Sequence, residues 1–218
     1  MGIAANVEVI RQEIAAACAR VGRLPESVRL IAVTKNQTPA VLAELAAAGI
    51  SDIGENRLEH QAEMHLTAVQ LGLQVHAIGR IQGRQLATLV PLSDCLHSLS
   101  SVDHIHRLVA ACAGRAAPFP VFLQVNTSGE AAKAGIEMEH LSAVIQALQV
   151  HPCIKIEGLM TMAPEGAEES LVRATFSRLR TLGKQFSVPR LSMGMSQDFT
   201  LAIEEGATDI RIGTRLFI

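Results

Sequence analysis

Short apolar runs alternate with longer amphipathic segments along most of the chain. Ile3, Val7, Ile10 and Ile14 recur at helical spacing, which predicts a first helix over residues 3–21. The next run, 28–35, is rich in aliphatic residues and ends in Lys35, a pattern typical of a buried strand. Seven further apolar runs predict strands at 51–56, 74–79, 95–99, 119–126, 154–160, 190–195 and 209–213.

Amphipathic segments separate these strands and predict the remaining helices. They cover residues 39–48, 57–71, 82–89, 102–112, 141–148, 165–186 and 198–205. Strands that alternate with helices indicate βαβ units and a parallel sheet. Eight such units predict an α/β fold: a single (β/α)8 TIM barrel with an extra N-terminal helix, with residues 1–218 as one domain. An open doubly wound sheet is the alternative, but no Gly-x-Gly-x-x-Gly motif follows the first strand.

The composition narrows the class of protein. Hydrophobic residues make up 49% and charged residues 18%, which supports a large packed core. The formal net charge of -2 and the lack of Trp and Tyr argue against binding to nucleic acid or to an anionic membrane surface. We find neither an apolar run of about 18 residues nor a signal peptide pattern, and the four cysteines are scattered, so we expect a cytoplasmic protein with free thiols. His104 and His106 lie two apart on a helix, and we expect no metal site.

Polar residues or glycines stand at the ends of nearly all the predicted strands. In a barrel these ends meet at one mouth, where the chemistry of such folds is found. Because loops begin there, polar residues are expected in any case, so the pattern is only moderate evidence for a site. The residues are Lys35, Glu55, Asn56, His76, Gly79, His97, Ser98, Gln124, Asn126, Met160, Thr161, Ser192, Ser196, Arg211, Gly213 and Thr214.

Two of these strand ends suggest a ligand. Lys35 is either a side chain that keeps its ammonium in water or a partly desolvated amine that forms a Schiff base with an aldehyde. Ser196, Gly213 and Thr214 offer the hydroxyl and backbone N–H groups that a phosphate needs, although an N-cap and a glycine turn would use the same residues. Pyridoxal 5′-phosphate carries both an aldehyde and a phosphate, and Arg211 would lie near its pyridine nitrogen.

The motifs resemble those of a known family, the pyridoxal phosphate homeostasis proteins, also called the proline-synthetase-co-transcribed family. These are single-domain barrels similar to the N-terminal domain of alanine racemase. The matching runs are Ala32–Lys35, Gly54–Asn56, His76–Gln82, Gln124–Asn126, Gly158–Met160, Leu191–Ser196 and Arg211–Thr214, together with Glu130, Lys133, Gly135, Pro164, Asp198 and Phe217. The sequence departs from the family pattern in three places: Arg57 replaces a usual Tyr, Arg84 and Gln85 replace Asn-Lys, and Ile218 replaces a Gly.

The resemblance implies a site and a role. Pyridoxal phosphate would be carried as an internal aldimine on Lys35, with its phosphate on Ser196, Gly213 and Thr214 and its pyridine nitrogen beside Arg211. Asn56, His76 and Met160 would line the pocket. Members of the family have no established catalytic activity; they are thought to buffer or deliver the cofactor and so to affect amino-acid and keto-acid balance. We therefore expect a monomeric carrier, with apo-enzymes that need pyridoxal phosphate as its recipients.

Two enzymatic alternatives remain open. A pyridoxal-phosphate-dependent amino-acid racemase would need acid–base groups on both faces of the cofactor, and the tyrosine that such racemases use has no counterpart here because the chain contains no Tyr. Racemases of this type also carry an additional β domain. A phosphosugar aldolase or isomerase barrel usually has its Schiff-base lysine on a later strand. We predict no catalytic residue.

Overall fold

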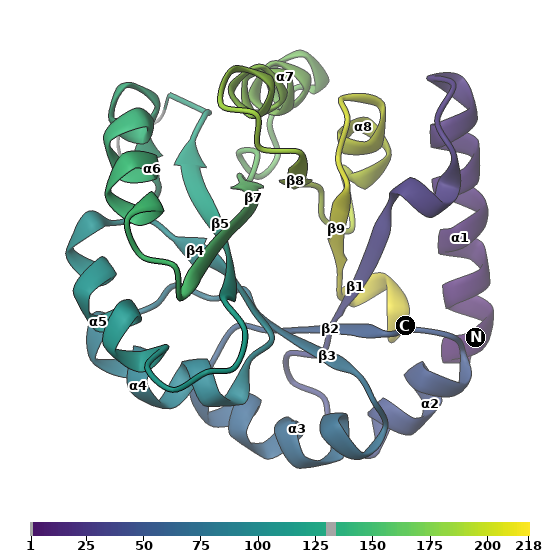
Figure 1. The fold of residues 1–218 in the computed structure, drawn as a ribbon. Coiled ribbons are helices and arrows are strands. Elements are labelled where there is room, and N and C mark those ends of the chain that lie inside the picture. The colour runs from purple at the N-terminus through teal and green to yellow at the C-terminus, as the bar shows by residue number, and fades with distance from the viewer. Residues whose placement is uncertain (1, 130–133) are drawn as a thin grey trace.

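Eight parallel strands close into a barrel with helices around it (Figure 1). The computed structural model describes residues 2–129 and 134–218. The strands follow the order β4-β3-β2-β1-β9-β8-β7-β5, and the pairing of β4 with β5 closes the ring. The predicted barrel is thus confirmed, and the open doubly wound sheet is excluded. The barrel strands are β1 (Arg29–Val33), β2 (Asp52–Glu55), β3 (Gln74–Ala77), β4 (Cys95–Leu99), β5 (Phe119–Asn126), β7 (Ile154–Met160), β8 (Arg190–Ser192) and β9 (Asp209–Ile212).

One short strand was not predicted. β6 (Ile136–Glu137) pairs in parallel with the end of β5, with Ile136 opposite Val125. Two residues are too few to show the period-2 pattern on which strand prediction depends. Glu130 and Lys133, two of the motif positions, lie outside the described residues.

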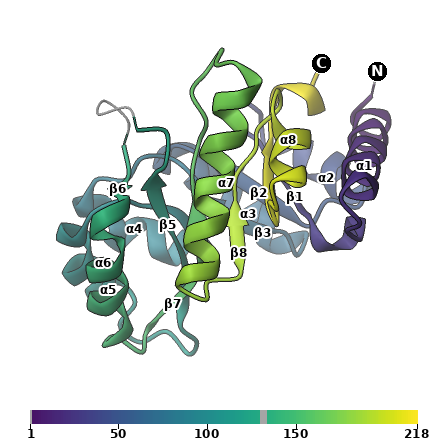
Figure 2. The same cartoon turned by 90° about the horizontal axis from the view of Figure 1, so that it is seen from above.

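The helices form the outer layer of the barrel. Figure 2 shows α6, α7, α8 and α1 following one another around the outside of the strands. The described α-helices are α1 (Ile3–Arg20), α2 (Val41–Ala47), α3 (Leu58–Gln70), α4 (Leu86–Leu89), α5 (Ile105–Ala111), α6 (Leu141–Gln149), α7 (Glu169–Gln185) and α8 (Phe199–Glu204). The predicted N-terminal helix is therefore present, and none of the described helices is long and apolar enough to cross a membrane.

Two element boundaries differ from the prediction for a local backbone reason. α7 begins at Glu169 rather than at residue 165, because Gly166 adopts a left-handed φ of 69° that a helix cannot contain. β8 ends at Ser192 rather than at residue 195, because Gly194 turns the chain with a φ of 95°. A Cβ at Gly194 would lie 2.6 Å from Cβ of Ala202, so this turn packs directly against α8.

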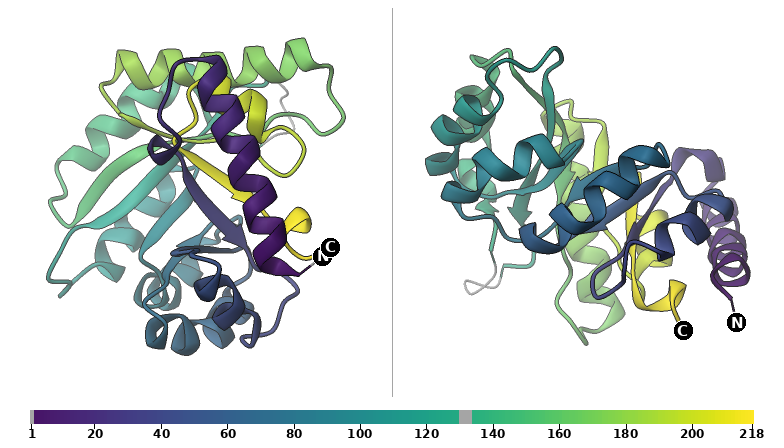
Figure 3. Two further views of the ribbon diagram at one scale, coloured as in Figure 1. Left: turned by 90° about the vertical axis from the view of Figure 1, so that its right-hand side faces the viewer. Right: turned by 90° about the horizontal axis from the view of Figure 1, so that it is seen from below.

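The two ends of the described chain lie side by side, as both panels of Figure 3 show. Asn6 on α1 is buried and donates from Nδ2 to the carbonyl oxygens of Leu216 and Ile218, at 3.1 and 2.8 Å. Because β1 pairs with β9, the first and the last strand are neighbours in the barrel. This pairing brings the beginning and the end of the sequence to one side of the barrel mouth.

Apolar and polar side chains are divided between the two faces of the barrel wall. The large apolar core contains the inner faces of the helices, including Val7, Ile10 and Ile14 of α1. A second, much smaller apolar cluster is separate from this core and consists of the buried side chains of Cys95, Phe122 and Met160. Around that cluster the buried residues are polar to an unusual degree for a barrel interior, which branched apolar side chains normally fill.

Candidate functional site

Lys35 lies in a turn directly after β1. Its side chain is exposed, and the next residue, Asn36, has a left-handed φ of 66°. The amide of Gln37 donates to the carbonyl of Thr34 at 2.9 Å and closes the turn around Lys35. The position just beyond the first strand agrees with the sequence, and of the two readings of Lys35 the exposure fits an ammonium kept in water. An exposed amine at a barrel mouth is accessible to an aldehyde that enters from solution.

The side chains of Glu55 and His60 hold this turn in place from the outer face of the barrel wall. The buried carboxylate of Glu55 accepts hydrogen bonds from the hydroxyl of Thr34 and, at 2.7 Å, from Nδ1 of His60 on α3. The other ring nitrogen of His60 lies 2.7 Å from the carbonyl oxygen of Gln37. The prediction that Glu55 faces the mouth is therefore wrong. Alternate residues of a strand point to opposite faces, and Glu55 points outward to the helix layer.

The neighbouring part of the rim is formed by the segments that follow β8 and β9. The backbone N–H of Gly213 donates to Oγ of Ser196 at 3.3 Å, so the structure brings together two of the three residues predicted to hold a phosphate. Oδ1 of Asp198 accepts from the backbone N–H of Met195 at 2.6 Å and tightens the same loop. Thr214 is exposed and opens the short 3-10 turn Thr214–Leu216.

The Lys35 turn and this rim are adjacent in space. Ala32 of β1 is paired with Ile212 of β9, and a Cβ at Gly213 would lie 3.4 Å from Cβ of Val33. Lys35 stands two residues beyond Val33. An amine, a hydroxyl and backbone N–H groups therefore surround one part of the barrel mouth, as expected for residues at the carboxyl ends of paired parallel strands.

Arg211 lies below this rim and is buried. Its Nη1 donates to Oγ of Ser192 on β8, and its Nη2 donates to the carbonyl oxygen of Thr161 at 3.2 Å. Burial lowers the pKa of the Arg211 guanidinium to about 10, so the group keeps its charge at neutral pH. The guanidinium is thus a fixed cation inside the barrel, directed toward the end of β7.

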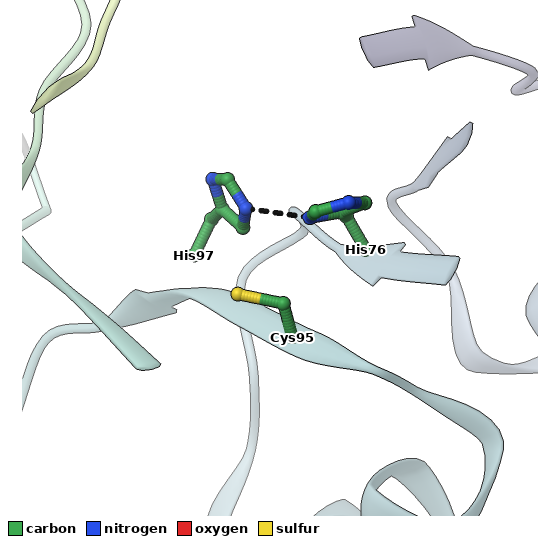
Figure 4. Close-up of side chains that lie close together, drawn as sticks. All are labelled: His76, Cys95 and His97. Carbon is green, nitrogen blue, oxygen red and sulfur yellow. Dashed lines mark hydrogen bonds between the residues drawn. The ribbon is translucent and has the colours of Figure 1, made fainter. Parts of the chain in front are cut away.

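His76 and His97 form a hydrogen-bonded pair in the barrel interior (Figure 4). Nδ1 of His76 lies 2.9 Å from Nε2 of His97. Nε2 of His76 lies 2.8 Å from Oδ1 of Asp52, and Nδ1 of His97 lies 2.8 Å from Oγ of Ser192. Because Asp52 is the first residue of β2, His76 is directed away from the mouth, deeper than the pocket-lining position predicted for it.

The imidazoles of His76 and His97 are both buried away from solvent. His97 is fully buried and stacks on Phe122 with ring centroids 4.2 Å apart. Burial, together with the nearby charge of Arg211, lowers the pKa of His97 well below its ordinary value. Burial alone would raise the pKa of the Asp52 carboxyl, but hydrogen bonds from His76 and Ser51 and the charge of Arg29 outweigh it and lower that pKa. This hydrogen-bonded group therefore has the neutral imidazole of His97 at one end and the carboxylate of Asp52 at the other.

Cys95 completes a cluster whose residue types suit a metal ion. The ligand atoms of His76, Cys95 and His97 all lie within 4.8 Å of one another. However, the two imidazoles share a direct hydrogen bond, and their outer nitrogens are bonded to Asp52 and Ser192. Burial raises the pKa of the Cys95 thiol, so the thiolate that a metal requires is disfavoured. This cluster fits a hydrogen-bond network better than a metal centre.

The remaining predicted residues occupy varied positions. Asn56 is exposed at the mouth, and Gly79 packs against it so closely that a Cβ would lie 2.0 Å from the Asn56 carbonyl oxygen. Met160 is buried beside Cys95 and Phe122. The buried side chain of Gln124 donates to the carbonyl oxygen of Ala134, and that of Asn126 donates to the carboxylate of Glu137. The hydroxyl of Ser98 donates to the carbonyl oxygen of Gly79 at 2.5 Å.

A charged group at the other end of the barrel was not predicted. Asp209 is fully buried and accepts from Arg190, with 2.5 Å between Nη2 and Oδ1. Arg29 lies between Asp52 and Asp209, at 3.5 and 3.6 Å. All four residues begin strands, whereas the predicted site residues lie at or beyond strand ends. A charged residue at the first position of an otherwise apolar strand was the signal that could have revealed them.

Fold and site together define a class: parallel eight-stranded barrels that present a lysine after the first strand and a hydroxyl and N–H rim after the last two. The comparisons with known proteins agree. Residues 3–218 match the family model described as alanine racemase, N-terminal domain. The chain is 37% identical to the pyridoxal phosphate homeostasis protein of Pseudomonas aeruginosa, over 99% of this chain and 94% of that protein. The chain therefore belongs to the family of the pyridoxal phosphate homeostasis proteins.

Solved structures support the same relationship. The structure of PipY from Synechococcus elongatus with pyridoxal phosphate bound aligns with a TM-score of 0.81 and 34% identity, over 94% of this chain and all of that one. Alanine racemase from Corynebacterium glutamicum aligns with a TM-score of 0.75 at 18% identity. The alignment covers 99% of this chain but 60% of the racemase, and at this identity it shows a shared fold alone.

Proposed function

We propose that this protein binds pyridoxal 5′-phosphate through Lys35 and acts in the homeostasis of that cofactor. One observation carries the proposal: the exposed Lys35 turn, which follows β1, lies beside the Ser196–Gly213 rim, which follows β8 and β9. The cofactor has an aldehyde and a phosphate, which match an amine and a set of hydroxyl and N–H donors. The names of the related proteins, and the cofactor bound to PipY, support the same reading.

The residues take the following roles in this proposal. The Lys35 amine would hold the cofactor covalently through its aldehyde, with loss of water. The Ser196 hydroxyl and the backbone N–H groups of Gly213 and Thr214 hold the phosphate, while Asn56 and Met160 line the pocket. Arg211 donates to the pyridine nitrogen. A guanidinium cannot give up its proton to that nitrogen, so the ring stays unprotonated and is a weak electron sink.

We propose a carrier rather than a racemase. Exchange of the α-proton on both faces of a bound amino acid needs two bases, and the sequence contains no tyrosine to act as the second one. The unprotonated pyridine ring, as a weak electron sink, also disfavours removal of the α-proton. In this role the protein acts as a monomer with a single domain, holds the cofactor and passes it to apo-enzymes. This transfer would influence amino-acid and keto-acid balance indirectly.

Covalent trapping tests the binding step. Purified protein is incubated with pyridoxal phosphate, reduced with borohydride and analysed by peptide mass spectrometry. We expect the label on the peptide that contains Lys35, its loss in Lys35→Ala, and normal labelling in Lys184→Ala, which removes an exposed lysine of α7. A wild-type protein that takes up no label and gains no absorbance with the cofactor refutes the proposal.

Isotope exchange separates the carrier from the racemase. The loaded protein is incubated with L-alanine in D₂O, and the α-proton is followed by NMR. A carrier leaves the α-proton in place over many equivalents of amino acid. Rapid exchange with formation of D-alanine would establish the racemase instead.

A further inference from the structure

A continuous hydrogen-bonded chain runs through the barrel from Arg211 to Asp52. It passes from the guanidinium to Ser192, then to His97, His76 and finally the carboxylate. The His97–Ser192 contact joins β4 to β8, two strands that are not neighbours in the sheet, so the chain crosses the interior. The three residues in the middle of the chain, Ser192, His97 and His76, are buried. Their polar atoms therefore need hydrogen-bond partners within the protein.

The direction of every hydrogen bond in this chain follows from Ser192. Among the described residues, its hydroxyl has two partners, Nη1 of Arg211 and Nδ1 of His97. Arg211 only donates, so the hydroxyl proton has one available acceptor, the Nδ1 of His97. A neutral His97 then carries its own proton on Nε2 and donates it to Nδ1 of His76. His76 in turn carries its proton on Nε2 and donates to Asp52.

The alternative protonation state is less favourable. An imidazolium at His76 would donate from Nδ1 to His97, which would then have to donate from its own Nδ1 to Ser192. Ser192 would receive two donors, and its own proton would be buried without an acceptor. A buried donor left unpaired loses its full hydration, which costs more than an average hydrogen bond gains. The arrangement with two neutral imidazoles gives every side-chain polar atom of Ser192, His97 and His76 a partner.

We propose that Ser192, His97 and His76 are positioning residues that hold the Arg211 guanidinium for an unprotonated ring nitrogen of the bound cofactor. This inference rests on the proposed function. Of the five N–H donors of Arg211, the bonds to Ser192 and Thr161 use two, and within the part of the chain that the structure describes the others are left for a ligand. A guanidinium held on one side by Ser192 and on the other by a backbone carbonyl keeps one orientation. The site therefore selects heteroaromatic rings with an acceptor nitrogen over rings that have C–H or an N-alkyl group there.

The far end of the chain is anchored by charge. Asp52 accepts from His76 and also lies 3.5 Å from Nη1 of Arg29, which in turn pairs with Asp209. The acceptor at the end of the chain is therefore held as a carboxylate by an independent partner. Hydrogen bonds in series polarise one another, so the carboxylate and the guanidinium stabilise the same direction of the chain from its two ends.

The tautomers test the chain without any ligand. Nitrogen-15 NMR of histidine-labelled protein at pH 7 should show His76 and His97 as neutral imidazoles, both protonated on Nε2. Assignments come from His76→Gln and His97→Gln. A proton on Nδ1 of His97, or a doubly protonated His76, overturns the proposed direction. Because the measurement uses the protein without added cofactor, it stands even where the proposed function fails.

Ligand discrimination tests the positioning role. Binding of pyridoxal phosphate is compared with that of 1-deazapyridoxal phosphate, in which C–H replaces the ring nitrogen. We expect the wild type to prefer the natural cofactor and Ser192→Ala to lose about tenfold of that preference, as expected for one hydrogen bond in a buried site. The exposed Ser142→Ala on α6 is the matched control and should keep the preference.

The outcomes are distinct. A Ser192→Ala variant that binds both compounds more weakly by the same factor has a purely structural defect and overturns the positioning role. A wild type that binds the two compounds equally also overturns it, because Arg211 then makes no contact with the ring nitrogen. A wild type that binds neither compound refutes the proposed function itself. Circular dichroism melting of the variant reports separately whether it folds.

Discussion

Nδ1 of His60 lies 2.7 Å from Oε2 of Glu55, a carboxylate that is almost completely buried between β2 and α3. The second ring nitrogen of the same imidazole faces the carbonyl oxygen of Gln37 at the same distance. Both partners are acceptors, so the imidazole satisfies both only when it carries two protons. A histidinium therefore holds the segment on one side of Lys35, while Thr34 is held by the same carboxylate on the other side.

This contact predicts pH-dependent stability. Burial lowers the pKa of His60, but the hydrogen bonds to Glu55 and Gln37 outweigh it, so the pKa lies above its ordinary 6.5. A raised pKa in the folded state stabilises the protein fully below 6.5 and loses this effect as the pH rises through the folded value. Urea unfolding of the wild type and His60→Gln should differ by about 2 kcal/mol at pH 5.5 and by less at pH 9.

The matched control for that experiment is His140→Gln. His140 is exposed, with 68% of its side chain accessible and only a long contact to Glu139, so its substitution should leave stability unchanged at both pH values. A difference between wild type and His60→Gln that stays constant from pH 5.5 to pH 9 would show that the imidazole is not charged in the folded protein.

Gly79 is predicted to tolerate no side chain. A Cβ there would lie 2.0 Å from the carbonyl oxygen of Asn56, a backbone atom that cannot move without shifting the end of β2. Gly79→Ala should destabilise the protein by about 3 kcal/mol or prevent folding, as overpacking against rigid atoms does. Gly2→Ala is the control, because nothing lies within 4 Å of its Cβ position. Equal melting temperatures for the two variants would contradict the close packing.

Ser196 should contribute to affinity for the phosphate group. Loss of a hydrogen bond to a charged group costs about 2 kcal/mol, so Ser196→Ala should weaken binding of pyridoxal phosphate about thirtyfold. Fluorescence or absorbance titration measures the dissociation constant, and Ser170→Ala, an exposed serine of α7, provides the control. Pyridoxal without the phosphate should bind the two proteins equally, and unequal binding of pyridoxal would place the effect elsewhere in the pocket.

Asp209 should be essential for stability rather than for binding. Its carboxylate is fully buried and pairs with Arg190 and Arg29. Asp209→Asn leaves two arginines without this partner and should destabilise the fold by about 3–5 kcal/mol in chemical denaturation. Glu139→Gln, at a site 80% exposed, should change stability by less than about 0.5 kcal/mol. A mildly destabilised Asp209→Asn would show that Asp52 and Glu157 can neutralise both arginines without it.

Much of the fold could be predicted because each barrel strand is a short apolar run between polar segments. The shared mouth also followed from the sequence: the parallel strands place Lys35 and Gly213 at the same end of the barrel. The direction of Glu55 could not be predicted, since one residue of register decides whether a strand side chain faces the interior or a helix. The sequence had identified both Glu55 and Lys35, but not the contact through His60 that connects them.

The hydrogen-bonded chain in the barrel interior could not be predicted from the sequence. His97 and Ser192 are separated by 95 residues, and their contact depends on the diameter of the closed barrel rather than on any local pattern. The hydrogen-bond partners of His76 could not be predicted for a related reason. Its side chain bonds to the first residue of the neighbouring strand, a partner that becomes visible only when the strand register is known.

The pairing of β1 with β9 has a consequence for how the protein is made. Lys35 emerges from the ribosome well before Gly213 and Thr214, which lie at the other end of the order of barrel strands. Contacts between such distant parts of a chain form late in folding, because a long loop must close before they are made. A nascent chain thus displays its reactive amine long before it can retain the phosphate, and cofactor capture becomes a signal that the ring of strands has closed.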